Sequence, residues 1–175
     1  IDSSQVQAYI DSTDRASDFA GYATNDTVEI TGNITVAQAI QLDAIAASKY
    51  IANISTGTVA DLKTITTNRG VNTNEFDITV TDTTAAADDL ILINTKTASA
   101  VSLGNVTTVT GIRTDLATLY AANGSTVTGL GNEAITVDDS VTAAQANIIN
   151  AYTTGIVTAT ISTTAIGDLD DLTGT

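Results

Sequence analysis

Short runs of alternating apolar and polar residues recur along the chain, and this alternation predicts β-strands. In the run 76–81, for example, Phe76, Ile78 and Val80 would lie on one face, with aspartate and threonine on the other. Threonine suits the outer face of a strand because it is both β-branched and polar. The pattern predicts six strands, at Val28–Thr31, Tyr50–Ser55, Phe76–Thr81, Ser99–Leu103, Ala134–Asp138 and Ile156–Ser162.

The six predicted strands are nearly evenly spaced. Their central residues follow one another at steps of 24, 24, 25, 34 and 24 residues. Parallel neighbours in a sheet need a crossover connection, and this spacing leaves room for one after each strand. We therefore expect one parallel sheet in which the central residues stack as a buried column. These central residues are Ile30, Ile54, Ile78, Leu103, Val137 and Ile161.

The segments between the strands have helical patterns. Residues 34–48, 85–95 and 141–154 carry apolar side chains at a spacing that fits a helix. Each of these segments has a threonine at or near its start, where a helix N-cap belongs. These threonines are Thr35, Thr84 and Thr142. The other three connectors share an Asp-Leu pair and predict shorter helices or 3₁₀ turns, at Thr58–Thr67, Thr107–Ala122 and Ala165–Leu172.

The chain also repeats itself. Residues 28–67 align with residues 135–174 without a gap, at an offset of 107, and twelve of the forty pairs are identical. A middle copy begins near Phe76. Similarity at a fixed period is typical of stacked repeats, so we predict an α/β fold of the right-handed parallel solenoid type. It would have about six strand–helix coils, a period of about 25 residues as in leucine-rich repeats, and a double-coil unit of about 50.

The repeat divides the chain into four segments. We expect an N-terminal helical coil or cap, followed by three copies of the repeat, with an insertion near residues 124–133 in the second copy. The third copy stops inside its second coil, so we expect it to be truncated and to continue into a further coil. The four segments are residues 1–25, 26–75, 76–133 and 134–175.

The residue types that are missing exclude several kinds of chemistry. The chain has no His and no Cys, so it lacks an imidazole base and a thiolate nucleophile. It also lacks the usual ligands of zinc, haem and iron–sulfur sites. Paired aspartates occur, but acid–base catalysis needs carboxylates that face each other in a cleft, which neighbours on a repeat surface do not. We therefore expect that the chain is not an enzyme.

The chain is strongly acidic. Its 20 acidic and 6 basic residues give a net charge of −14, which argues against nucleic acid and anionic membrane surfaces as partners. No apolar run is long enough to span a bilayer, so we expect no membrane insertion. Aspartate oxygens are suitable ligands for Ca²⁺, although the alternatives of a solvated acidic surface and of helix capping stay open. The candidate calcium ligands are Asp82, Asp138, Asp139, Asp168, Asp170 and Asp171.

One part of the chain resembles a known family. The run 127–139, Val-Thr-Gly-Leu-Gly-Asn-Glu-Ala-Ile-Thr-Val-Asp-Asp, is followed by Thr-Ala-Ala at 142–144. It resembles the tandem repeats of giant Thr- and Ala-rich surface proteins of marine cyanobacteria and other aquatic bacteria. The resemblance implies a repeat segment of a giant secreted or cell-surface protein, and it implies no catalytic residues.

These observations favour a structural role. We expect a stiff, self-stacking spacer in an extracellular filament, a surface layer or a giant surface protein, with head-to-tail contact to another copy or to neighbouring repeats as its partner. The alternative is a binding module, either a calcium-dependent adhesin or an ice-binding module. Ice binding would require Thr-x-Thr in every coil, and the sequence has this pattern at Thr79–Thr81 and Thr158–Thr160 but not in every predicted strand.

Overall fold

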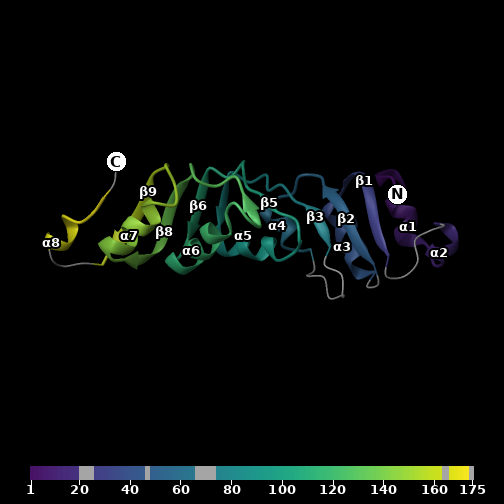
Figure 1. Cartoon of the computed structure of the whole chain (residues 1–175), viewed down its shortest axis with the longest axis horizontal. Helices are drawn as coiled ribbons and strands as arrows, with labels where there is room; N and C mark the ends of the chain where they lie inside the picture. The colour runs from purple at the N-terminus through teal and green to yellow at the C-terminus, as the bar shows by residue number, and fades with distance from the viewer. Residues whose placement is uncertain (20–25, 46–47, 66–73, 163–165, 174–175) are drawn as a thin grey trace. The chain divides into compact units, whose positions relative to one another are not determined.

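The computed structural model describes residues 1–19, 26–45, 48–65, 74–162 and 166–173 (Figure 1). They form two compact units. The first unit consists of Ile1–Thr81 and Leu92–Ser102, and the second of Asp82–Ile91 and Leu103–Thr175. In both units helices alternate with strands that pair in parallel, so the predicted α/β class is confirmed. Helix α5 (Ala87–Asn94) contains the boundary between the units.

The first unit is built around a three-stranded sheet in the order β1-β2-β3. The pairing of β1 with β2 and of β2 with β3 is parallel in both cases. Its strands are β1 (Thr27–Ile34), β2 (Lys49–Ile54), β3 (Glu75–Asp77) and the short β5 (Val101–Ser102). Its helices are η1 (Ser3–Gln5), α1 (Val6–Asp11), α2 (Arg15–Asp18), α3 (Val36–Ala44) and α4 (Val59–Leu62).

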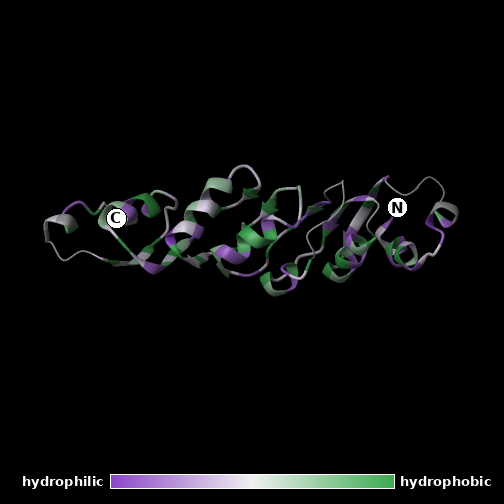
Figure 2. Cartoon of the chain, turned by 90° about the horizontal axis from the view of Figure 1, so that it is seen from below, coloured by the Kyte–Doolittle hydropathy of each residue, from purple (hydrophilic) through white to green (hydrophobic). Residues whose placement is uncertain are grey.

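The second unit is built around a four-stranded sheet in the order β4-β6-β8-β9, again parallel throughout. Its strands are β4 (Thr84–Ala86), β6 (Thr108–Gly111), β7 (Val127–Thr128), β8 (Ala134–Val141) and β9 (Val157–Ile161). Its helices are α6 (Arg113–Ala122), α7 (Ala143–Asn150) and α8 (Ile166–Leu169). Apolar and polar residues alternate on these elements and on those of the first unit (Figure 2), as expected of elements with one buried face.

The repeat found in the sequence is present in the structure. Strand β1 and strand β8 begin and end at positions that are 107 residues apart, and helices α3 and α7, which follow them, also begin 107 residues apart. The two helices also begin alike. Thr35 accepts the Gln38 N–H at 3.2 Å and the Gln38 side chain accepts the Thr35 N–H at 2.9 Å, and Thr142 and Gln145 repeat both bonds at 3.2 and 2.9 Å. These capping boxes confirm two of the three predicted N-caps.

The predicted column of central residues is only partly correct. Five of the six are buried, but Ile161 is half-buried, and the register differs from the prediction. Ile54 lies opposite Ile34 rather than Ile30, and Ile161 lies opposite Val141 rather than Val137. The reason is a bulge in each longer strand. Residues 30–32 lie opposite the single residue Ala52, and residues 137–139 lie opposite Ala159, so each partner is displaced by two positions.

Three strands, β4, β6 and β7, were not predicted, and a single sheet was expected where the structure has more than one. The strands of the described residues lie in separate sheets of three and four strands, with the short β5 and β7 outside both. Thr84, predicted as a helix N-cap, lies in β4, and the segment Thr107–Ala122 contains β6 before its helix. The signal for β6 was present, because its buried Val109 alternates with two half-buried threonines.

The four predicted sequence segments concern repeats, whereas the two units reflect contacts, and the predicted boundaries stay a prediction. Within the segment expected to be a helical cap, residues 3–18 do contain η1, α1 and α2. Its end, at residues 20–25, lies outside the described residues. The predicted insertion near 124–133 contains β7 and ends on the buried Glu133.

Candidate functional site: the outer edge of strand β9

Strand β9 is an end strand of the sheet in the second unit. On its inner side it pairs with β8, where the Ile135 N–H donates to the Ile156 carbonyl and the Ser162 N–H donates to the Val141 carbonyl, both at 2.8 Å. Backbone groups alternate in direction along a strand, so those of Val157, Ala159 and Ile161 point to the outer side. In the described part of the chain no strand pairs with this outer edge.

A groove of about 510 Å³ runs beside this edge. Helix α7, strand β9 and residues 172–173 form its walls. Two amides, Asn147 and Asn150, supply polar groups to the α7 side. The Asn147 amide also holds the wall formed by the C-terminal segment, because it donates to the Asp171 carbonyl at 2.7 Å and accepts the Thr173 N–H at 2.9 Å. The apolar lining residues are Ala146, Ile156, Val157, Ala159, Ile161 and Leu172.

The internal repeat shows what the corresponding surface looks like in the first unit. Val157, Ala159 and Ile161 align with Tyr50, Ala52 and Ile54 of β2. These three β2 residues are 0, 4 and 2% exposed, whereas their β9 counterparts are half-buried. The difference arises because β2 has a strand on each side and β9 has one.

The same contrast holds after the strand. Leu62 and Ile65 of the first unit are fully buried. Their counterparts Leu169 and Leu172 are each 42% exposed. Apolar side chains that are core in one copy of a repeat are therefore surface in the other, and an exposed patch of this kind is typical of an interaction surface.

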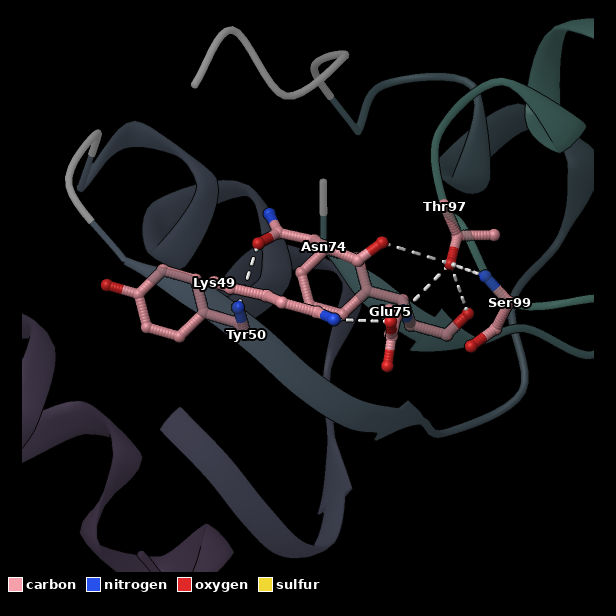
Figure 3. A network of polar contacts seen from close by, with 7 residues as sticks. Lys49, Tyr50, Asn74, Glu75, Thr97 and Ser99 are labelled. Atoms are coloured by element: carbon pink, nitrogen blue, oxygen red, sulfur yellow. Dashed lines mark hydrogen bonds and ion pairs between the residues drawn. The ribbon is translucent and has the colours of Figure 1, made fainter. Parts of the chain in front are cut away.

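Strand β3 is the strand that covers the outer edge of β2, and a polar network holds it there (Figure 3). The central residue is Asn74, which is 1% exposed. Its Oδ1 accepts the Tyr50 N–H at 2.9 Å, and its Nδ2 donates to Asp43 Oδ1 at 3.0 Å. Lys49 and Glu75 add an ion pair at a more exposed position. Asn74 thus satisfies a backbone donor at the start of β2 that the β3 backbone does not reach.

A buried threonine satisfies the far side of β3. Thr97 Oγ1 accepts the Phe76 N–H at 2.8 Å and the Ser99 N–H at 3.0 Å, and it lies 2.8 Å from the Phe76 carbonyl, to which it can donate (Figure 3). In the second unit Thr153 has the same role, because it donates to the Glu133 carbonyl at 2.6 Å and accepts the Gly155 N–H at 2.9 Å. A buried hydroxyl at a chain corner is therefore a recurring structural device here.

The second unit also contains a buried carboxylate. Glu133 is 1% exposed, and it accepts hydrogen bonds from the Tyr120 hydroxyl, from the Gly131 N–H at 2.7 Å and from the Asn132 N–H at 3.0 Å. The Tyr120 ring stacks on Tyr152 with the ring centroids 4.9 Å apart. Sequence reasoning missed Glu133, Asn74 and Thr97, because nothing in the composition of their neighbourhoods separates a buried polar residue from a loop residue.

Burial and the nearby Glu133 raise the pKa of Tyr120, and burial together with Tyr9 raises the pKa of Tyr50. Above the usual tyrosine pKa of about 10, the unfolded chain loses these protons while the folded chain keeps them. We therefore expect the free energy of unfolding to fall as the pH rises above about 10. Urea unfolding between pH 8 and pH 11 measures this, and Tyr120→Phe should flatten the dependence. An unchanged pH profile in that variant would contradict the assignment to Tyr120.

The predicted calcium ligands are not brought together by the residues that the structure describes. Asp82 precedes β4, Asp138 and Asp139 lie in β8, and the exposed Asp170 and Asp171 follow α8. Asp168 lies in α8, but its side chain lies outside the described ones. Across the described residues no group of three or more acidic side chains could hold a metal ion. Calcium binding stays a prediction.

Asp139 has a different role in the structure. Its Oδ1 accepts the N–H of Arg113, the first residue of α6, at 2.8 Å. The residue before it, Ile112, has no side chain that could cap the helix. An aspartate of the neighbouring coil therefore caps α6, and its negative charge is favourable at a helix N-terminus.

Comparison with known proteins found no relative of this chain. The chain matches no protein-family model, no curated protein and no solved structure. None of the helices in the described residues has the length and apolar character needed to cross a membrane.

Proposed function

We propose that the chain is a structural repeat segment and acts as a stiff, self-stacking spacer in an extracellular filament, a surface layer or a giant surface protein. In this proposal the strand–helix coils continue one another as a right-handed parallel solenoid, and the β9 groove is where the next coil stacks. The observation that carries the proposal is the recurrence of one coil design. The same strand length, bulge and capping box occur in both copies.

The mechanism would be mechanical. Parallel strands lie about 4.8 Å apart, so each added coil lengthens the stack by a fixed step. Backbone hydrogen bonds and a continuous apolar seam connect each coil to the next, and in a repeat array such nearest-neighbour contacts supply most of the stability. The net charge of −14 would make neighbouring stacks repel one another.

Tandem proteins test the proposal. Thr175 aligns with Asn68 at the offset of 107, so residues 69–175 joined to the end of the chain continue the repeat in phase. In solution scattering, the maximum dimension should rise linearly with the number of such additions if the spacer is stiff. The matched control carries a Gly-Ser linker at each junction, and its dimension should rise more slowly. Equal growth of the two series would contradict the spacer.

A binding module is the second candidate, because threonines form a ladder in the second unit. Thr110, Thr136 and Thr158 lie in register across β6, β8 and β9. Ala86 and Ala134 interrupt the ladder in the neighbouring positions, which is why the spacer is preferred. Ice-recrystallisation inhibition by the purified chain would favour an ice-binding module. A rise in Tm that is larger in millimolar Ca²⁺ than in NaCl of equal ionic strength would favour a calcium-dependent adhesin.

A further inference from the structure

Among the residues that the structure describes, no strand pairs with the outer edge of β9, and an apolar groove lies beside this edge. The outward-pointing backbone groups belong to Val157, Ala159 and Ile161, whose side chains also line the groove. Ile156, beside them, is 77% exposed. A sheet edge of this kind can pair with an added strand, with main-chain bonds supplying affinity and side-chain pockets supplying specificity.

The first unit shows which strand fits such an edge. In β2 the corresponding edge pairs with β3, with Ala52 opposite Phe76 and Asn53 opposite Asp77. Phe76 is fully buried there, and Asp77 is exposed. Asn74 precedes the strand and bonds both β2 and helix α3, as described above.

We propose that the edge of β9 binds a parallel β-strand of the type Asn-acidic-Phe-Asp, in the register that β3 adopts on β2. This inference rests on the proposed function, since it names the strand through which the next coil would stack. At the offset of 107 the incoming Phe lies opposite Ala159, and the Asp lies opposite Thr160. The incoming Asn meets the Val157 N–H and the Asn150 side chain.

The groove is suited to the Asn and Phe side chains of the incoming strand. Asn150 takes the place of Asp43, and its amide oxygen can accept the N–H of an incoming Asn as the Asp43 carboxylate does. Ala159 corresponds to Ala52, the small residue that lies opposite Phe76 in the first unit, and Ile161 corresponds to an identical residue, Ile54. The small side chain of Ala159 leaves space beside it for the bulky Phe of the incoming strand.

One of the differences between the two copies bears directly on which strand would bind. Lys49, which pairs with Glu75 in the first unit, is replaced by Ile156. The ion pair therefore cannot form on β9. We expect an apolar residue at the acidic position of the strand to bind at least as well as Glu, because it would cover part of the exposed Ile156 side chain.

The test adds one further coil to the chain. Residues 69–102 are joined after Thr175, which supplies a second copy of the β3 segment in phase with β9. Amide hydrogen exchange is then compared between the parent and the extended chain. The Val157, Ala159 and Ile161 amides should exchange roughly tenfold more slowly or better in the extended chain, because they become hydrogen-bonded. Unchanged exchange at these amides would overturn the inference.

Three variants separate the proposed register from general covering of the edge. Replacing the appended Phe76 by Lys should remove the protection from exchange. Asn150→Ala should reduce the protection of the Val157 amide and leave the exchange of amides far from the groove unchanged. Replacing the appended Asp77 by Ala is the matched control and should keep full protection, since Asp77 is exposed in the first unit. Full protection with the appended Phe76→Lys would overturn the inference.

A synthetic peptide of residues 74–82 tests the same contact without a fusion. Chemical-shift changes confined to β9 and α7, and absent with a peptide carrying Phe76→Lys, would support it, whereas changes elsewhere would contradict it. The result of this test can be distinguished from the result of the tandem-protein test of the spacer. Stiff tandem proteins whose β9 amides stay unprotected would retain the spacer and reject the strand, and flexible tandem proteins with protected amides would do the reverse.

Discussion

Replacing Ile54 by aspartate is expected to destabilise the chain severely. Ile54 is 2% exposed and lies in β2 between two strands, so the change removes a core aliphatic side chain and buries a charge. The loss of a buried aliphatic side chain alone costs about 2–5 kcal/mol, and the desolvated carboxylate adds to it. Urea denaturation monitored by circular dichroism measures the change in the free energy of unfolding.

The matched control is Ile161→Asp, at the equivalent position of the other copy. Ile161 is half-buried in an end strand, so its replacement should cost less than half as much as that of Ile54. From the sequence alone the two substitutions are expected to be equivalent. Equal destabilisation would mean that the edge of β9 is covered in solution, for example by a second copy of the chain.

Replacing Glu133 by alanine is the second change with a large expected effect. It leaves the Tyr120 hydroxyl and the N–H groups of Gly131 and Asn132 without their acceptor. A buried donor without a partner costs about 1–3 kcal/mol, so we expect a total loss of about 3 kcal/mol or more. Thermal and urea unfolding both measure it.

Two further variants locate the cause of that loss. Tyr120→Phe removes one donor together with its need for an acceptor, and the double variant with Glu133→Ala should be less destabilised than the sum of the two single variants. Glu29→Ala is the matched surface control, because the Glu29 side chain is exposed, and it should change stability by less than about 0.5 kcal/mol. Additive effects of the Tyr120 and Glu133 changes would contradict a direct contact between them.

Much of the local structure could be predicted from the sequence. The alternation in 76–81 and 134–138 located strand residues and their buried faces, and the spacing of the connectors located α3, α5 and α7. Thr35 and Thr142 were recognisable as N-caps because capping depends on residues three positions apart. Thr84 failed by the same rule, since a threonine is as favourable in a strand as in a cap.

The candidate site could be predicted only in outline. The sequence predicted head-to-tail contact without naming the residues that make it. In the structure Ile161 is half-buried, and Leu169 and Leu172 are each 42% exposed. The groove itself, its amide wall and the role of Asn74 in holding β3 could not be read from the chain. They depend on which residues two separate segments bring within hydrogen-bonding distance.

The repeat, the α/β class, the N-caps Thr35 and Thr142 and the absence of His and Cys chemistry follow from the sequence alone. These properties depend on composition or on residues close together along the chain. The tertiary structure decided the register between strands, because two extra residues in β1 and β8 are accommodated by bulges that no local pattern records. It also decided the burial of Asn74, Thr97 and Glu133, since a polar side chain becomes a core residue only where distant backbone groups need its hydrogen bonds.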